Sequence, residues 1–279
     1  MEISFCNADD KGYQERLNRL LKPIFLDFKF WYDLRLWDSN YESYSIMEND
    51  EIVSNICVYK TEVLLYGKRY QALSVGAVAT AEAYRGKGYA RRIMEHIIGK
   101  YPDMPMYLSA NETVLDFYPR FGFERVVEHL PVANYRIDND LLAHMIRFDN
   151  PKVWEYVYNR KNFSSVLDCE NTASINLFHI YLGPLKECIY EIPELQTMVI
   201  AEKERDVLRI AGVFSLAEIA FSDLEKYLPF RNVSVVEFGF MPCWKDIEYE
   251  MRAVETDPLF VRGVRCDPGK VKFPDLSFT

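Results

Sequence analysis

The residues with the clearest potential for chemistry form a short loop with two glycines, in the sequence YRGKGYARR. Four basic side chains belong to this loop or follow it directly: Arg85, Lys87, Arg91 and Arg92. A run of small apolar residues precedes the loop, and a helical periodicity follows it. Its apolar positions lie on one helical face: Ala90, Ile93, Met94, Ile97 and Ile98. We therefore expect a strand, a loop and a helix that begins near Gly88.

A helix that begins at this loop would offer a binding site for an anion. Its first turn has free backbone N–H groups and the positive end of the helix dipole. Gly86 and Gly88 would let the backbone approach a ligand closely. Only Glu82 opposes the basic residues nearby. The pattern favours a phosphate or pyrophosphate site, and the alternative is a tight turn with a solvated basic face.

Other phosphate motifs and metal motifs are absent from the sequence. A dinucleotide-binding fingerprint would need a third glycine at position 91, which is Arg91, and no P-loop pattern occurs. The six cysteines are scattered and form no Cys-x-x-Cys pair: Cys6, Cys57, Cys169, Cys188, Cys243 and Cys266. We expect reduced thiols in a cytoplasmic protein without a bound metal, and an extracellular disulfide scaffold is the weaker alternative.

Composition narrows the range of partners. The chain has 279 residues, of which 49% are hydrophobic, so it can bury a large core and is long enough for two domains. A net charge of −9 argues against a broad surface for nucleic acid or anionic membranes. No apolar run approaches the ~18 residues of a membrane span, and the start MEISFCNADDKGY turns polar too early for a signal sequence.

Strand-like and helix-like segments alternate through the first half of the chain. They are a hairpin at 44–59 that turns at Asn49-Asp50, a hairpin at 60–80 that turns at Gly67-Lys68, a strand at 105–110, a helix at 113–121 and closing strands up to 137. This order predicts a mixed α/β fold for residues 1–140. The Asp- and Asn-rich segment 137–151 is the candidate boundary to a second α/β domain at 150–279.

The order of residues in VAT....RGKGYA resembles the acetyl-coenzyme A motif of the GNAT superfamily of N-acetyltransferases. That motif is Arg/Gln-x-x-Gly-x-Gly/Ala, which Arg85, Gly88 and Ala90 match. A second family block, YLSANETVLDFYPRFGF, follows about 20 residues later, at 107–123. The resemblance covers roughly residues 1–140 and implies a GNAT-like α/β fold with acetyl-CoA as acyl donor. Tandem members with one degenerate repeat exist, so residues 150–279 could be such a repeat, without a second coenzyme site.

The resemblance also implies which residues bind the coenzyme. In this fold the strand carrying residues 77–80 splays away from the strand at 106–110, and the pantetheine arm pairs with the backbone in the gap. The amides of residues 85–90 hold the pyrophosphate. The expected coenzyme-binding residues are Val78, Ala79, Thr80, Arg85, Gly86, Lys87, Gly88, Tyr89, Ala90 and Asn111. For Asn111, capping of the following helix is the alternative.

Two proton transfers need catalytic groups in such a reaction. Tyr118 matches the family tyrosine that protonates the leaving thiolate, although it could equally be a core aromatic of an amphipathic helix. Glu82 is the nearest acidic candidate, in sequence, for the base that deprotonates the acceptor, and it could also be a solvated residue or an ion-pair partner of Arg85. Some multidomain acetyltransferases use a C-terminal carboxylate, which makes Thr279 a further candidate.

The acceptor would be an amine, bound near the early helices. That region has aromatic and acidic residues that suit a cation: Trp31, Tyr32, Asp33, Trp37, Asp38, Tyr41, Glu42 and Tyr44. An aromatic core face is the alternative, and the acceptor class stays open between a polyamine, an amino sugar, an amino acid and a peptide N-terminus. The second half could close one wall of the pocket, or act as a structural or homodimerising domain. The rival functions are a non-catalytic coenzyme A sensor or scaffold and a nucleotide-phosphate enzyme.

Overall fold

The computed structural model describes all residues except 1, 7–9, 112–113, 142–143, 162–163 and 265–268. Within the described residues the strands are β1 (Ser4–Cys6), β2 (Tyr41–Glu48), β3 (Glu51–Leu65), β4 (Lys68–Thr80), β5 (Met106–Ser109), β6 (Glu124–Ile137), β7 (Leu167–Glu170), β8 (Ile189–Ile192), β9 (Thr197–Glu204), β10 (Val207–Ser215), β11 (Val233–Phe238) and β12 (Glu250–Arg262). The helices are α1 (Lys11–Leu21), α2 (Lys29–Asp33), α3 (Tyr89–Lys100), α4 (Pro151–Asn159), α5 (Ala173–Tyr181) and α6 (Phe221–Leu224).

Short 3-10 turns connect several of these elements: η1 (Glu82–Tyr84), η3 (Tyr118–Phe121), η4 (Gly183–Glu187), η5 (Pro193–Leu195), η6 (Glu225–Tyr227) and η7 (Asp275–Ser277). The described strands join one twelve-stranded mixed sheet, so the predicted mixed α/β class is confirmed. No helix among the described residues is long and apolar enough to cross a membrane.

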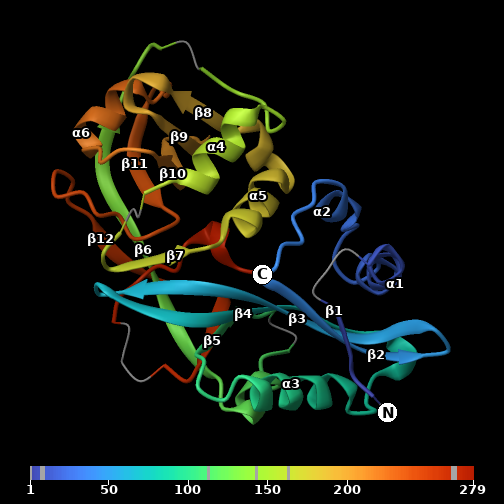
Figure 1. The fold of residues 1–279 in the computed structure, drawn as a ribbon. Helices are drawn as coiled ribbons and strands as arrows, with labels where there is room; N and C mark the ends of the chain where they lie inside the picture. The colour runs from blue at the N-terminus through green and yellow to red at the C-terminus, as the bar shows by residue number, and fades with distance from the viewer. Residues whose placement is uncertain (1, 7–9, 112–113, 142–143, 162–163, 265–268) are drawn as a thin grey trace.

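The sheet interleaves strands from both halves of the chain. Its order is β1-β2-β3-β4-β5-β12-β6-β11-β10-β9-β8, and β7 pairs with β3. The late strand β12 therefore lies between β5 and β6, and β6 is long enough to pair with β12 and with β11. In Figure 1, β6 runs from the lower half of the molecule to the upper half. The division into 1–140 and 150–279 stays a prediction, and the two ranges share this sheet.

Helices cover opposite faces of the β2–β5 part of the sheet (Figure 1). On one face α3 buries Ile93, Met94 and Ile97 against β2 to β5. On the other face α1 packs through Leu17 and Leu21, which are 1% and 0% exposed. Each such leucine contributes roughly 1.5–3 kcal/mol by leaving water, so this packing fixes both helices on the sheet.

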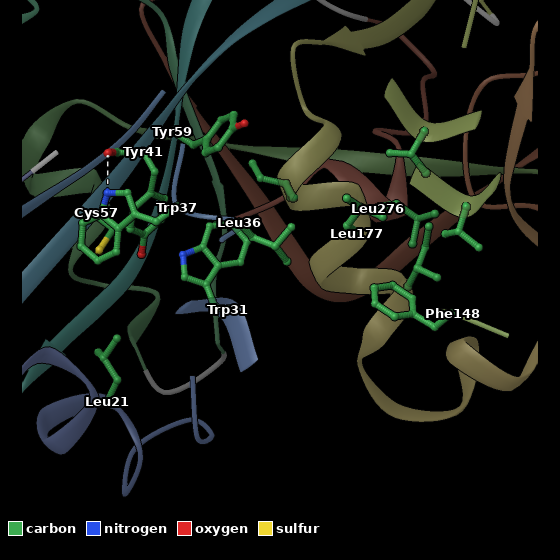
Figure 2. Packing of buried hydrophobic residues seen from close by; sticks show 14 of the residues in the cluster. Leu21, Trp31, Leu36, Trp37, Tyr41, Cys57, Tyr59, Phe148, Leu177 and Leu276 are labelled. Atoms are coloured by element: carbon green, nitrogen blue, oxygen red, sulfur yellow. Dashed lines mark hydrogen bonds between the residues drawn. The ribbon is translucent and has the colours of Figure 1, made fainter. Parts of the chain in front are cut away.

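The core on the α1 face joins the two halves of the chain. Figure 2 shows Leu21, Trp31 and Trp37 from the first half in the same buried cluster as Phe148 and Leu177 from the second half. In the close-up the Trp37 indole nitrogen donates to the carbonyl oxygen of Tyr41 at 3.1 Å. Because the apolar faces are buried against each other, α5 has a defined place beside α2 and the sheet.

Two local predictions from the sequence differ from the structure. The predicted helix at 113–121 is replaced in its described part by irregular turns and η3, and residues 112–113 lie outside the described residues. Pro119 explains this, because a proline inside a helix lacks an N–H donor and clashes with the preceding turn. The second hairpin turns at Tyr66 and Gly67, with φ of 48° and 75°, one residue earlier than predicted.

Candidate active site

The two-glycine loop follows β4 and η1 and leads directly into α3, so strand, loop and helix occur in the predicted order. Gly88 is the residue before the first turn of α3. Gly86 and Gly88 both have φ of +76°, a left-handed conformation that strains other residues. A Cβ added at either glycine would meet no atom within 4 Å. The space above the loop is therefore open, and the backbone conformation itself requires glycine.

The basic side chains around this loop are exposed, and several of them have weak local partners. The Nε of Arg85 donates to the Thr80 carbonyl oxygen at 3.3 Å, so its partner is not the Glu82 carboxylate. The Nζ of Lys87 lies 4.4 Å from the ring centroid of Tyr84. Arg91 is paired with Glu95 on the helix surface, at 2.7 Å. Arg85 and Lys87 thus add positive charge at the N-terminus of α3, where the helix dipole already favours an anion.

A β-bulge distorts β4 shortly before the loop. Gly76 pairs with Cys57 and Ala79 pairs with Asn55, so two residues of β4, Ala77 and Val78, lie opposite a single residue of β3. Ala77 has φ of 47°, and its carbonyl oxygen accepts a hydrogen bond from the Asn55 side chain at 3.2 Å. A bulge bends its strand and redirects its backbone groups. This one lies in the segment that the sequence assigned to the coenzyme.

Next to the bulge, β4 and β5 separate. Their parallel pairing covers only two positions, Leu73 with Met106 and Ser74 with Tyr107. Beyond them β4 continues to Thr80 while β5 ends at Ser109. The predicted splaying of these strands is therefore confirmed. The backbone of Val78 and Thr80 lies in the part of β4 that is not paired with β5, before the loop that precedes α3.

The end of the sequence lies at the point where the strands separate. The backbone N–H of Thr279 donates to Ser74 Oγ at 3.1 Å, and the two hydroxyl oxygens are 2.7 Å apart. A Cβ on Gly76 would lie 2.5 Å from the carbonyl carbon of Thr279. Gly76 is therefore needed for this close approach. The catalytic role suggested for Thr279 stays a prediction.

A pocket of about 230 Å³ lies beside the bulge, on the α2 side of the sheet. It is lined by Phe25, Leu26, Phe28, Trp31, Tyr41, Gly76, Ala77, Ile175, Phe178, His179, Leu182, Phe278 and Thr279. Most of this lining is aromatic or aliphatic, and α5 supplies one wall from the second half of the chain. No carboxylate side chain belongs to it.

The acidic residues that the sequence predicted beside the aromatics form hydrogen bonds or ion pairs with other side chains and do not line the pocket. Asp38 accepts hydrogen bonds from Tyr59 at 2.5 Å and from Ser174 at 2.8 Å. Glu42 is buried and pairs with Lys60 at 2.6 Å. Asp33 is exposed and pairs with Lys29. Two of the predicted aromatic residues, Trp31 and Tyr41, do line the pocket.

Tyr118 is buried in the same core cluster as Ile93, Met94 and Ile97 of α3, with 5% of its surface exposed. Its ring packs against Phe117, Phe123 and Phe260, the last of which comes from β12. Burial raises the pKa of Tyr118 to about 12. The phenol thus carries its proton at neutral pH, as a proton donor must. Its environment fits both a core aromatic and the catalytic role, which stays a prediction.

The other predicted polar residues lie at the surface. Glu82 is exposed at the start of η1, and its carbonyl oxygen accepts from the Arg85 N–H at 3.2 Å. Its side chain does not belong to the pocket lining. Asn111 is exposed after β5, where its carbonyl oxygen accepts from Val114 N at 3.1 Å in a turn. The roles predicted for both residues remain predictions.

His179 was not identified from the sequence. It lies on α5, lines the pocket, and its Nε2 is 2.7 Å from the carbonyl oxygen of Phe278. Burial lowers the pKa of His179 from its usual value of 6.5. The only indication in the sequence was a histidine within an apolar helix-like run, INLFHIYL, which does not show what the ring contacts.

Part of the chain is similar to known proteins. Residues 11–126 match the family described as acetyltransferase (GNAT) domain. The UPF0039 protein sll0451 of Synechocystis is 39% identical over 62 residues, which are 21% of this chain and 40% of that protein. Protein ElaA of Escherichia coli is 32% identical over 85 residues, 29% of this chain and 52% of that protein. The chain thus spans about half or less of these relatives.

The fold as a whole is shared with longer solved structures. A probable N-acyltransferase from Enterococcus faecalis has a TM-score of 0.58 at 15% identity, over 94% of this chain and 72% of that chain. Eis1 from Mycobacterium abscessus has a TM-score of 0.57 at 14% identity, over 94% of this chain and 73% of that chain. Both likenesses extend beyond residues 11–126 into the second half, and at this identity they establish the fold alone.

Proposed function

We propose that this protein is an N-acetyltransferase that moves the acetyl group of acetyl-CoA directly to a primary amine of a small molecule or peptide. The match to the GNAT domain family supports acyl transfer in general. The observation that carries the proposal is the short pairing of β4 with β5, which stops at Ser74, in a strand that lines the apolar pocket with Gly76 and Ala77 and is followed by the two-glycine N-terminus of α3. The bound coenzyme, its acetyl group and the amine acceptor would then lie next to one another along β4.

The residues present fit a coenzyme with a pyrophosphate and a thioester. A Cβ on Gly86 or Gly88 would meet no atom within 4 Å, which supports close approach of a phosphate to the amides of residues 85–90. Arg85 and Lys87 are exposed there and add charge. The pantetheine arm would pair with the backbone of Val78 and Thr80. Ala79, Tyr89, Ala90 and Asn111 complete the proposed coenzyme site.

The reaction would proceed by direct attack. The neutral amine attacks the thioester carbonyl carbon, and a backbone amide near the end of β4 stabilises the oxyanion of the tetrahedral intermediate. The C–S bond then breaks. Tyr118 would give its proton to the leaving thiolate and regain one from the nitrogen of the new amide. The proton lost earlier by the ammonium passes to a base and then to water, and Glu82 is the base candidate taken from the sequence.

The pocket beside the bulge would hold the acceptor. Its volume of about 230 Å³ gives room for a small amine. Its aromatic lining suits an apolar body, and it offers no carboxylate side chain to a second or third cationic centre. We therefore favour amines with one apolar group over polyamines and amino sugars.

The test is the release of free thiol when purified protein is mixed with acetyl-CoA and a panel of amines, with the acetylated product identified by mass spectrometry. Turnover that requires both substrates supports the proposal. Tight coenzyme binding without turnover of any amine would contradict it and favour a coenzyme A sensor or scaffold. Competition by ATP at an affinity similar to that of acetyl-CoA would instead favour a nucleotide-phosphate enzyme.

A further inference from the structure

His179 has a defined tautomer in this pocket. A carbonyl oxygen can only accept a hydrogen bond, so the 2.7 Å contact with Phe278 requires that Nε2 of His179 carries the hydrogen. In the neutral ring, Nδ1 then keeps its lone pair. No hydrogen bond to Nδ1 is found among the residues that the structure describes. The ring is thus fixed at one nitrogen and able to accept a proton at the other.

The surroundings of His179 keep its ring neutral. Phe178 lies beside it, with ring centroids 5.3 Å apart, and the pocket around it is apolar. Asp275 is the charged group that acts on the ring, and its charge favours protonation. That carboxylate is already paired with Arg209 at 2.6 Å and with Lys272 at 2.8 Å. Desolvation therefore prevails, and the pKa of His179 is lowered.

We propose that His179 is the general base that deprotonates the acceptor, an inference that rests on the proposed function. Nδ1 takes one proton from the ammonium group of the amine in the pocket, which leaves a neutral nitrogen with a lone pair. That lone pair forms the new C–N bond as the C–S bond breaks, and the imidazolium returns its proton to water. The Phe278 carbonyl stabilises this imidazolium because Nε2–H still donates to it.

The position of His179 distinguishes it from Glu82, whereas Thr279, the other candidate base, lines the same pocket. His179 lines the same pocket as Gly76 and Ala77 of the bulge, next to the gap proposed for the thioester. Glu82 is exposed and lies outside that lining. The competing interpretation is that His179 only anchors Phe278 through its hydrogen bond. A glutamine separates the two roles, because its Nε2 amide can donate to the same carbonyl but cannot act as a base at neutral pH.

The experiment compares pH profiles of kcat/KM for wild type and His179→Gln, with acetyl-CoA and the best amine of the panel. We expect the variant to lose about a hundredfold or more at neutral pH. Its rate should recover as the pH approaches about 10, where the amine deprotonates itself. His129→Gln is the matched control, since His129 also contacts a backbone carbonyl, that of Val127 at 3.1 Å, but lies outside the pocket. A purely anchoring role would not produce recovery at high pH.

Two results would overturn the role of His179 alone: an active wild type with an unchanged His179→Gln variant, or a loss in the variant that is the same at every pH. A wild type that binds acetyl-CoA and acetylates no amine would contradict the proposed function, and with it the role of His179 as general base. A second measurement needs no turnover. Nitrogen-15 histidine spectra, assigned with the same variant, should show a neutral Nε2–H tautomer at neutral pH, and an imidazolium or an Nδ1–H tautomer would overturn the proposal.

Discussion

A side chain on Gly76 would place its Cβ 2.5 Å from the carbonyl carbon of Thr279, closer than folded proteins tolerate. These residues are distant in the sequence, yet they meet where β4 and β5 separate. The contact brings the segment that carries Phe278 against the β-bulge. It thereby links the gap proposed for the thioester to the pocket that contains His179.

The first prediction concerns this contact. Gly76→Ala should displace the segment around Thr279 and cost about 1–3 kcal/mol of unfolding free energy, as overpacking typically does. It should also lower kcat/KM. Gly99→Ala is the control, because Gly99 lies on α3 with nothing within 4 Å of an added Cβ and an alanine there should stabilise the helix. Denaturant unfolding and thiol release measure both effects, and equal behaviour of the two variants would contradict the prediction.

The second prediction concerns Tyr118. Tyr118→Phe removes only the hydroxyl and leaves the packing against Phe123 and Phe260 in place. We expect kcat to fall about a hundredfold while the affinity for acetyl-CoA and the thermal stability change little. Single-turnover kinetics with calorimetry test this. Unchanged turnover would exclude Tyr118 from the mechanism and leave it as a core aromatic.

The third prediction concerns the acceptor. The pocket has an aromatic lining without a carboxylate side chain, so phenethylamine should show a higher kcat/KM than spermidine or an aminoglycoside at matched concentrations. Competition experiments with both amines in one reaction give the ratio directly. A preference for the polycation would show that the acceptor binds elsewhere on the protein.

The fourth prediction follows from the lowered pKa of His179. The unfolded ring binds a proton as the pH falls below 6.5, whereas the folded ring does so only at lower pH. The unfolded state then holds more protons, so the free energy of unfolding must fall as the pH decreases through this window. Urea unfolding at neutral and mildly acidic pH should show this loss in wild type and less of it in His179→Gln. The same pH dependence in both proteins would contradict the prediction.

The coenzyme loop could be predicted from the sequence because its determinants are local. Gly86, Gly88 and the apolar face of α3 lie within a few residues of one another, and each reflects a backbone or packing requirement of its own segment. The splaying of β4 from β5 followed from the family resemblance, and the strand pairing confirmed it. Pro119 is also a local signal, because a proline at this position argues against a helix at 113–121. The prediction of that helix did not take it into account.

The acceptor side of the site could not be predicted in the same way. His179 and Phe278 lie 99 residues apart, and only the packing of α5 beside the sheet brings them together. Likewise, the pairing of β12 between β5 and β6 depends on contacts across the whole chain. Periodicity identifies an element and its buried face, but it does not identify the element that covers that face.

The most direct measurement is a calorimetric titration of acetyl-CoA into wild type, Gly88→Ala and Gly88→Glu. Both substitutions impose the same backbone strain at φ of +76°, and only the glutamate adds negative charge to the proposed pyrophosphate site. We predict micromolar binding by wild type, weaker binding by the alanine variant and none by the glutamate variant. Correctly folded wild type that does not bind acetyl-CoA, or equal binding by all three proteins, would contradict it.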